Sequence, residues 1–236
     1  MIKTIETQVA YIPLNQIASY PEDRFRLIDP KKCAQLKISL LKSGQTHPFL
    51  LEKTEIEAYR LLDGHQRFET ISKIKEEGGA WEKAMGLIVQ SDTTTLVDRF
   101  RLVWEKNSSD ENRYGLYERS CCFKRFFQLG LSMKTISEVT GFSTHAVEDH
   151  IELSAIKTTL AEIVNTSSIE AMYALMLHHR YEAWLQTPYA DQARFIAQRV
   201  LDHAKKETCT TKSWRFLLDF YWNKKRPFLS GRHPRS

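Results

Sequence analysis

The stretch LLDGHQRFET, residues 61–70, joins an apolar strand-like run to an amphipathic helical run, and its polar residues gather at the join. A helix N-terminus presents unpaired backbone N–H groups and a partial positive charge, so Gly64 there would let an anion approach the backbone closely. Arg67 adds a forked, permanently charged donor that suits phosphate. These residues predict a phosphate-binding turn. A lone G-x-x-R spacing also fits a purely structural role, in which Asp63 caps the helix and Arg67 pairs with a surface carboxylate.

The elements around this turn form a small mixed α/β unit. Between residues 8 and 90, the β-like runs VAYIPL, PFLLEK, AYRLLDG and AMGLIV alternate with two helical runs. We expect Asp29 to cap the first helix and Gly44 to end it, and the second helix to span about His65 to Glu77. One apolar face of the first helix is predicted from Cys33, Leu36, Leu40 and Leu41.

After Ser91 the strand pattern ends and the chain reads as helical almost throughout. The polar run KNSSDEN is the expected hinge, because Ser, Asp and Asn side chains compete with helix by bonding to nearby backbone. The predicted fold class is therefore α+β. The expected domains are an α/β domain at 1–91, a connecting helix and hinge at 92–112, a helical domain at 113–222 and a basic tail at 223–236.

Composition sets limits on the class of protein. The 236 residues are 42% hydrophobic and 27% charged, and no stretch approaches the roughly 18 apolar residues of a membrane span. The first residues lack the features of a secretory signal, so we expect a cytoplasmic protein with no membrane partner. Four cysteines without a CxxC pair predict reduced thiols and no metal site. A net charge of +5 is compatible with a polyanionic partner.

Four segments, taken in order, resemble the N-terminal domain of the ParB family of chromosome and plasmid partition proteins. They are YIPLNQI, then Arg26 and Asp29 before a helix, then SLLKSGQTHPFLL, and then YRLLDGHQRFET. The resemblance implies that Gly44, Gln45 and Pro48 line a nucleotide pocket, and that the turn with Gly64, His65 and Arg67 binds the phosphates of CTP. The same domain is similar to the core of sulfiredoxins and of a free-serine kinase. Sulfiredoxins need a cysteine in this turn, where this chain has His65, so a reductase is disfavoured.

A third family element, an Asn-rich segment that completes the nucleotide and magnesium site, corresponds to WEKNSSDENRYGLYERS. The resemblance places Asn107 and Glu118 in the nucleotide site, with Gly115 where the family has proline. Three positions after Asn107 the family has arginine and this chain has Asp110. An acid there would repel a triphosphate unless a metal intervened. Two outcomes therefore stay open: the chain binds CTP with magnesium as the family does, or its CTP binding is weakened, altered or lost. At most a weak CTPase is expected.

Residues 129–156 have the layout of a DNA-binding helix-turn-helix, whose two helices and turn lie at 132–153. Ser132 and Ser143 are the expected N-caps, and Gly141 supplies the positive φ that the tight turn requires. The residues expected to reach DNA are Lys134, Ser143, Thr144, His145 and Glu148. With Asp149 beside Glu148 this surface is acidic. It therefore predicts either cytosine-biased base reading or a contact with another protein.

The C-terminal residues are basic and aromatic. We expect a last helix to about Trp222 and then a basic arm whose Lys224, Lys225 and Arg226 contact DNA phosphates. A core-packing helix, a small dimer contact and a solubilising tail are the alternatives. Compared with a typical partition protein, the chain has hardly any room for the N-terminal segment that engages a motor ATPase or for a C-terminal dimerisation domain.

The predicted function is a ParB-like, sequence-specific DNA-binding protein, which acts as a plasmid or chromosome partition factor or as a transcriptional regulator and is switched by CTP. The expected partners are double-stranded DNA, a second copy of the chain and a partner ATPase, with the protein on the nucleoid or a plasmid. The first alternative is a nucleotide-dependent phosphotransferase or nuclease with His65 or Glu118 as acid or base. The second is an interaction protein whose acidic helix binds another protein.

Overall fold

The computed structural model describes residues 5–27, 30–54, 58–108, 113–156, 158–165, 169–188, 190–204 and 213–221. Its contacts divide the chain into two compact units. The α/β unit comprises Met1–Arg113 and Arg125–Gly141, and the helical unit comprises Tyr114–Lys124 and Phe142–Ser236. Helix α4 (Leu116–Gln128) therefore supplies residues to both units.

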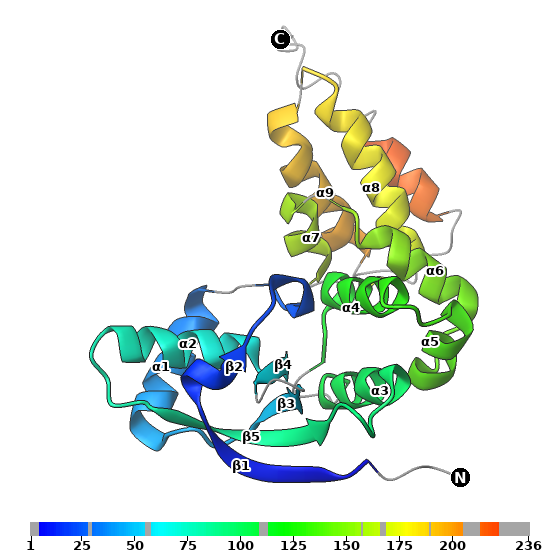
Figure 1. Ribbon diagram of the computed structural model, residues 1–236. Coiled ribbons are helices and arrows are strands. Elements are labelled where there is room, and N and C mark those ends of the chain that lie inside the picture. The colour runs from blue at the N-terminus through cyan, green and yellow to red at the C-terminus, as the bar shows by residue number, and fades with distance from the viewer. Residues whose placement is uncertain are drawn as a thin grey trace, which may run out of the picture. The chain divides into compact units, whose positions relative to one another are not determined.

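A five-stranded mixed sheet forms the centre of the α/β unit, in the order β1-β5-β3-β4-β2 (Figure 1). Its strands are β1 (Thr7–Pro13), β2 (Ile17–Ala18), β3 (Phe49–Lys53), β4 (Tyr59–Asp63) and β5 (Lys83–Gln90). The pairs β1–β5 and β3–β4 are antiparallel, whereas β3–β5 and β2–β4 are parallel. The four longer strands confirm the predicted strand runs. The short β2 strand was not predicted, because two residues are too few to show an alternating pattern.

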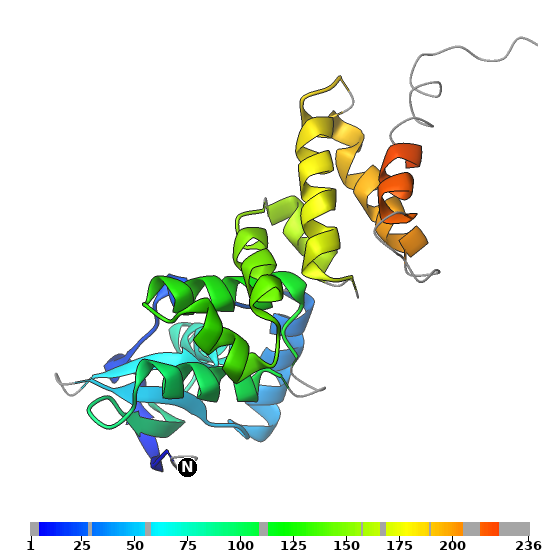
Figure 2. The ribbon, with the colours of Figure 1, turned by 90° about the vertical axis from the view of Figure 1, so that its right-hand side faces the viewer.

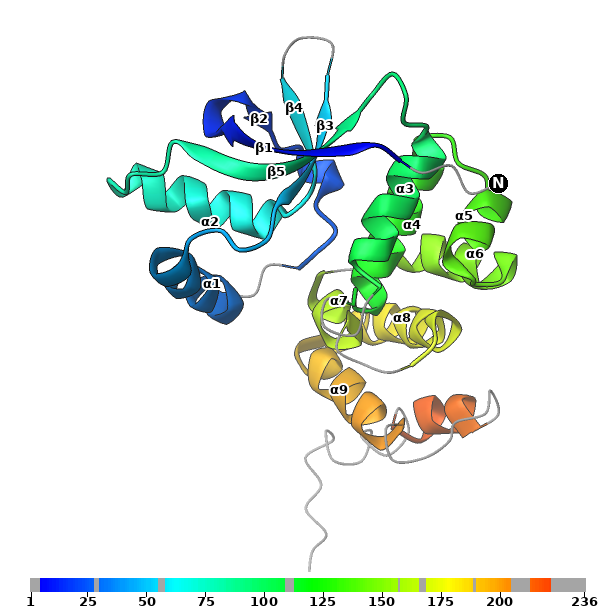
Figure 3. The ribbon, with the colours of Figure 1, turned by 90° about the horizontal axis from the view of Figure 1, so that it is seen from below.

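Helices α1 (Pro30–Ser43) and α2 (His65–Glu76) lie on one side of β3 and β4, and α3 (Leu96–Lys106) lies on the other (Figures 1 and 3). Both predicted helices are confirmed. The predicted apolar face of α1 is wrong at Leu41, which is 62% exposed, because the buried stripe is narrow and centres on Leu40. Asp29, the predicted cap of α1, lies outside the described residues.

Apolar side chains fill both sides of the sheet in this unit. Between the sheet and α1 and α2, the core includes Phe49, Leu51, Leu61, Ile71 and Ile74. On the α3 side, the rings of Phe100 and Phe126 lie 4.7 Å apart, and Phe25 contacts Phe126 at 6.4 Å between centroids. The α/β unit also contains α5 (Met133–Thr140), whose Ile136 is fully buried.

The helical unit contains the first part of α4 together with α6 (Thr144–Leu153), α7 (Thr158–Asn165), α8 (Ala171–Leu185), α9 (Ala193–Ala204) and a helix at 213–221. Figure 2 shows α8, α9 and this last helix side by side, in yellow, gold and orange-red. Trp214 in the last helix is fully buried and its ring lies 5.4 Å from that of Tyr173. The last helix therefore packs into the core. No helix among the described residues is long and apolar enough to span a membrane.

Candidate functional site

The turn between β4 and α2 is shaped by Gly64, which is the N-cap residue of α2 and has φ of 103°. A Cβ atom on this residue would lie 2.8 Å from Cδ1 of Phe49, so both the backbone conformation and the packing require glycine. No side chain caps α2, and its first turn contains no acidic residue. The alternative in which Asp63 caps the helix is therefore wrong, and no side chain among the described residues accepts from the N–H groups at the start of α2.

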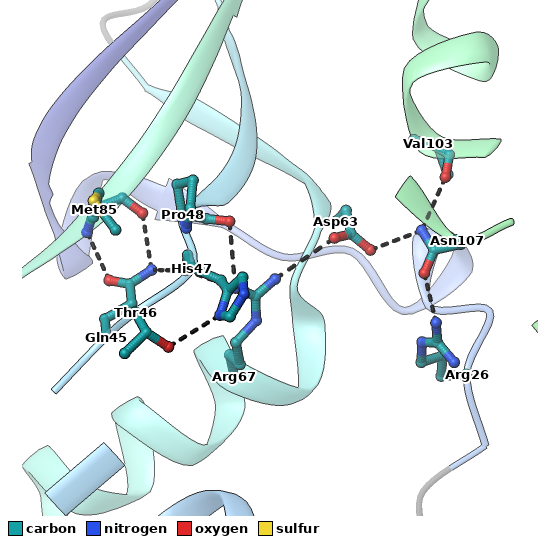
Figure 4. A network of polar contacts seen from close by, with 10 residues as sticks. All are labelled: Arg26, Gln45, Thr46, His47, Pro48, Asp63, Arg67, Met85, Val103 and Asn107. Carbon is teal, nitrogen blue, oxygen red and sulfur yellow. Dashed lines mark hydrogen bonds and ion pairs between the residues drawn. The ribbon is translucent and has the colours of Figure 1, made fainter. Parts of the chain in front are cut away.

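Arg67 points from the first turn of α2 towards the loop that precedes β3 (Figure 4). Its Nη1 donates to the carbonyl oxygens of His47 and Pro48 at 2.6 and 3.3 Å, and its Nη2 lies 3.6 Å from Oδ2 of Asp63. Burial lowers the pKa of the guanidinium, although Asp63 opposes that shift. Arg67 remains charged and is held in place by neighbouring backbone and by the carboxylate of its own turn.

Gln45 fixes the other side of the same loop. Its Oε1 accepts from the backbone N–H of Met85 at 2.7 Å, and its Nε2 donates to the Met85 carbonyl at 2.9 Å. The same Nε2 also donates to the His47 carbonyl at 3.0 Å, so Gln45 and Arg67 share one acceptor. Gly44, which has φ of 70°, ends α1 immediately before this residue. The loop between α1 and β3 is therefore tied to both β5 and α2.

Asn107 joins the end of α3 to the same turn (Figure 4). Its Nδ2 donates to Oδ1 of Asp63 at 3.1 Å and to the Val103 carbonyl at 2.9 Å, and its Oδ1 accepts from Nη2 of Arg26 at 2.7 Å. Asn107 is only 3% exposed, so these bonds satisfy an amide that water cannot reach. The structure thus brings together Gln45, Gly64, Arg67 and Asn107, which the sequence predicted as one site.

Positively charged side chains lie near one another in this network. The charge of Arg26 acts on Arg67, and the carboxylate of Asp63 acts on both Arg67 and Lys106. Burial lowers the pKa of the Lys106 ammonium; the carboxylate of Asp63 opposes this shift, and the charge on Arg67 adds to it. An anion would relieve this repulsion, because it would supply the opposite charge within a partly buried site. The electrostatics therefore favour a negatively charged ligand.

His65 is the first residue of α2. Its Nε2 is buried and has no hydrogen-bond partner among the described residues. Burial lowers the pKa of the imidazole to about 4, against the effect of Asp63, so the ring is neutral near pH 7. A neutral imidazole can donate or accept one hydrogen bond, and it adds no charge to the site.

Glu118, which the resemblance assigned to the nucleotide site, lies in the helical unit. Its Oε2 accepts from the backbone N–H of Gly115 at 3.0 Å, and its own backbone N–H donates to Oδ1 of Asn165 at 3.1 Å. A Cβ atom at Gly115 would lie 2.2 Å from that same oxygen, which explains why glycine precedes α4. Glu118 therefore holds the start of α4, and its assignment to the nucleotide site stays a prediction.

The predicted helix-turn-helix consists locally of two short helices and the turn between them. Ser132 caps α5 by accepting from the N–H of Thr135, Gly141 ends α5 with φ of 77°, and Ser143 caps α6 by accepting from the N–H of Ala146. The predicted DNA-facing side chains are exposed, and three of them form ion pairs with neighbours on the same helix. Lys134 lies 3.9 Å from Glu138, and His145 lies 3.6 Å from Glu148.

The remaining predicted residues are Asp110, Lys224, Lys225 and Arg226, and all four lie outside the described residues. Among the residues that are described, no group of three or more His, Cys, Asp or Glu side chains could hold a metal ion. Sequence reasoning missed the role of Asp63, which pairs with Arg67 and Asn107 at once. It also missed Thr46, whose hydroxyl contacts Nδ1 of His47 at 3.0 Å. The role of Asp63 could have been predicted from its position, because a carboxylate at the end of a strand and directly before a glycine turn lies close to the first turn of the next helix.

Comparison with solved structures identifies the fold. A pNOB8-like ParB N domain aligns with 96% of this chain and 99% of its own length, at 13% identity and a TM-score of 0.51. The C-terminally truncated chromosome-partitioning protein ParB from Caulobacter crescentus, complexed with CTP-γ-S, aligns with 83% of this chain and 98% of its own length, at 14% identity and a TM-score of 0.36. Sulfiredoxin from Arabidopsis thaliana aligns with 36% of this chain and 91% of its own length, at 22% identity and a TM-score of 0.30.

Sequence comparisons give no closer relative. No family model matches the chain, and no curated protein matches it. The alignment with the pNOB8-like ParB N domain shows that the chain has the ParB N-domain fold, as its sequence motifs predicted.

Proposed function

We propose that this protein binds a nucleotide at the α2 turn and binds DNA site-specifically through α5 and α6, as a partition factor or a transcriptional regulator. The observation that carries the proposal is the polar network that links Gln45, Arg67, Asp63 and Asn107 around the uncapped start of α2. This network combines helix N–H groups that no described side chain caps with clustered positive side chains, and both favour a polyphosphate.

CTP is the nucleotide that the sequence resemblance indicates. Its phosphates would accept from the first N–H groups of α2 and from Arg67, which would exchange its contact with Asp63 for a phosphate oxygen. Asn107 and Arg26 would complete the site from the α3 side. Because Asp63 is the carboxylate that this network contains, magnesium would be held mainly by the phosphates themselves. His65, neutral and buried, would orient the ligand without adding charge.

DNA reading is proposed for the exposed N-terminal part of α6. Thr144, His145 and Glu148 lie on its first turns, Ser143 caps it, and all four residues are exposed, which supports the proposal that α6 is a recognition helix. Glu148 can accept from cytosine N4, whereas Lys134 and the C-terminal Lys224, Lys225 and Arg226 would contact phosphates. A homodimer would double the contacts that one helix-turn-helix makes, and a partner ATPase would act on the dimer if the role is partition.

The experiment is selection of fragmented genomic and plasmid DNA on the purified protein, followed by sequencing, with and without CTP and magnesium. We expect enrichment of one defined, palindromic site, and a change in its occupancy or spreading when CTP is present. A Thr144→Ala/Glu148→Ala double variant should lose the enrichment, and Lys73→Gln, an exposed change on α2, should keep it. Uniform recovery of all fragments under both conditions would reject sequence-specific reading. Metal-dependent turnover that requires Arg67 would then favour an enzyme.

A further inference from the structure

A second cluster of charged residues lies on the α3 side of the sheet and shares no residue with the candidate nucleotide site. Asp23 accepts from Nε and Nη2 of Arg60 at 2.9 and 2.6 Å and from Nε of Arg125 at 3.0 Å. Glu52, in the middle of β3, places its Oε1 2.7 Å from Nε of Arg99 on α3. The Glu52 side chain is 5% exposed and that of Asp23 is 8% exposed. This cluster is therefore removed from water, and the network at Arg67 does not use it.

Four residues of this cluster border a cavity of about 220 Å³ within the α/β unit. Asp23, Glu52, Arg60 and Arg99 supply its polar lining. The rest of the lining is apolar and comes from Phe25, Leu62, Leu96, Val103, Phe126 and Leu129. Leu129 is 39% exposed, so the cavity can be reached from solvent beside this residue. An apolar cavity with a few convergent polar groups is the usual form of a small-molecule site.

The buried part of the cluster holds more positive groups than negative ones. Arg60, Arg99 and Arg125 carry three positive charges, and the carboxylates that face them are Asp23, Glu52 and Glu22. Glu22 is half-exposed and lies 3.6 Å from Nη2 of Arg125, whereas Asp23 and Glu52 are buried. Burial raises the pKa of the Glu52 carboxyl, although Arg99 and Arg60 oppose that shift. A ligand with a single negative charge would therefore complete the pairing of the three guanidinium groups inside the unit.

The two arginines that line the cavity keep donors available for such a ligand. Arg60 uses Nε and Nη2 on Asp23, which leaves Nη1 without a hydrogen bond to any described residue. Arg99 Nε lies 2.7 Å from Oε1 of Glu52 and is occupied by this ion pair, whereas its Nη1 and Nη2 make no hydrogen bond to a residue that the structure describes. Planar guanidinium groups match the geometry of a carboxylate.

We propose that this cavity binds a small organic carboxylate with an aromatic or branched aliphatic body. Its carboxylate accepts from Arg60 and Arg99, and its body packs against Leu62, Val103 and Leu129. The volume would hold about seven waters at roughly 30 Å³ each, which corresponds to a molecule about the size of benzoate. Since Val103 lies one helical turn before Asn107 and bonds to it, the ligand would contact the helix that also completes the nucleotide site.

The test is fluorine NMR of the full chain with 4-fluorobenzoate and with its neutral analogue 4-fluorobenzamide. The two probes differ in charge and share shape and apolar body. We expect saturable broadening of the benzoate resonance and affinity for the amide weaker by about tenfold or more, which is the loss of one charge-assisted hydrogen bond. Equal affinity for the two probes, or no saturable binding of benzoate, would overturn the proposal.

Variants locate the binding. Leu129→Trp, at the exposed edge of the cavity, fills part of it and should weaken benzoate binding by about tenfold or more. Phe127→Trp is the matched control, because Phe127 is similarly exposed at 38% and does not line the cavity. Arg60→Gln, which leaves Asp23 paired with Arg125, should weaken benzoate binding and leave the amide unchanged. Circular dichroism verifies the fold of each variant. Benzoate binding that survives both Leu129→Trp and Arg60→Gln would contradict the assignment.

Discussion

The Nδ2 atom of Asn107 donates a 3.1 Å hydrogen bond to Oδ1 of Asp63, a residue 44 positions earlier in the chain. This bond joins the end of α3 to the end of β4, immediately before the turn at Gly64. The other carboxylate oxygen of Asp63 faces Arg67 at 3.6 Å. Asp63 therefore links Arg67, which the resemblance assigned to the phosphates, with Asn107, which it also assigned to the nucleotide site.

Replacing Asn107 by alanine should destabilise the α/β unit by about 1–3 kcal/mol, because Asp63 and the Val103 carbonyl would lose a buried donor. Urea unfolding measures the change. Ser108→Ala is the control, since the exposed Ser108 hydroxyl donates to the nearby Glu105 carbonyl and to no other described residue. This variant should stay within about 0.5 kcal/mol of the original protein. Equal stability of the two variants would show that the Asn107 bonds contribute nothing.

Alanine substitutions at Gly64 and Gly44 distinguish the energetic cost of a strained backbone from the cost of steric crowding. Gly64→Ala must adopt a positive φ and also push Phe49 aside, because the new Cβ would lie 2.8 Å from the ring. Gly44→Ala must adopt a positive φ but meets no atom within 4 Å. Strain alone costs about 1–2 kcal/mol, so Gly44→Ala should lose about that much and Gly64→Ala at least 1 kcal/mol more. Thermal unfolding of both variants measures the loss of stability. Equal losses would show that the contact with Phe49 adds no cost at Gly64.

Asp63→Asn should tighten nucleotide binding. The carboxylate repels phosphate and occupies Arg67, whereas an asparagine keeps an oxygen that can accept from Asn107 and carries no charge. We expect a several-fold decrease in the dissociation constant for CTP, measured by calorimetry at constant ionic strength. Glu69→Gln, on the exposed face of α2, removes the same charge from a residue outside the network and should change binding little. A weaker Asp63→Asn complex would mean that Asp63 serves the ligand directly, for example through magnesium.

The stability of the helical unit should fall in acid because of His150. The hydroxyl of Ser120 donates to the Leu116 carbonyl, so it accepts from Nδ1 of His150 at 2.8 Å, and the ring is neutral. Burial lowers the pKa of His150 to about 3 from its ordinary 6.5, and Arg119 adds to that shift. Between these pH values the unfolded chain binds a proton that the folded chain does not, so stability is lost as pH falls through this window.

The measurement is urea unfolding at several pH values between 4 and 7. His150→Gln keeps a donor for Ser120 and removes the titration, so its stability should depend on pH less steeply, by up to about 1.4 kcal/mol per pH unit. His145→Gln, at a side chain that is 78% exposed, should retain the original profile. His65, whose pKa burial also lowers, is present in both variants and does not affect the comparison. If His150→Gln kept the full pH dependence, another group would be responsible.

The main elements of the α/β unit could be predicted because their signals are local. Pro30 and Gly44 mark the ends of α1, and Gly64 and the apolar spacing of Ile71 and Ile74 mark α2. The position of the turn at Gly64, between a strand and a helix, was also predicted correctly, whereas phosphate binding by this turn stays a prediction. Order and spacing of such segments were enough to indicate the ParB N-domain fold, even though identity to the solved structure is 13%.

The remaining features depend on which distant residues meet. Glu52 occupies a buried position within an apolar strand run, directly opposite Arg60, but its ion-pair partner Arg99 comes from α3. Asp23 bonds to Arg125, which is 102 positions away. Glu118 was assigned by its place in a motif, whereas its carboxylate accepts a backbone N–H at the start of α4. Spacing along the chain carries no information on such long-range pairs, so neither the cavity nor these contacts could be predicted.

The most direct test of the nucleotide site is calorimetric titration of CTP with magnesium into the original protein, Arg67→Gln and Arg101→Gln. Arg101 lies on α3, is 36% exposed and pairs with Asp98, so it provides the same substitution outside the network. We predict saturable binding to the original protein and to Arg101→Gln, and binding to Arg67→Gln weaker by about tenfold to a hundredfold, as for one charged hydrogen bond. No binding to the original protein, or equal binding to all three, would contradict the account.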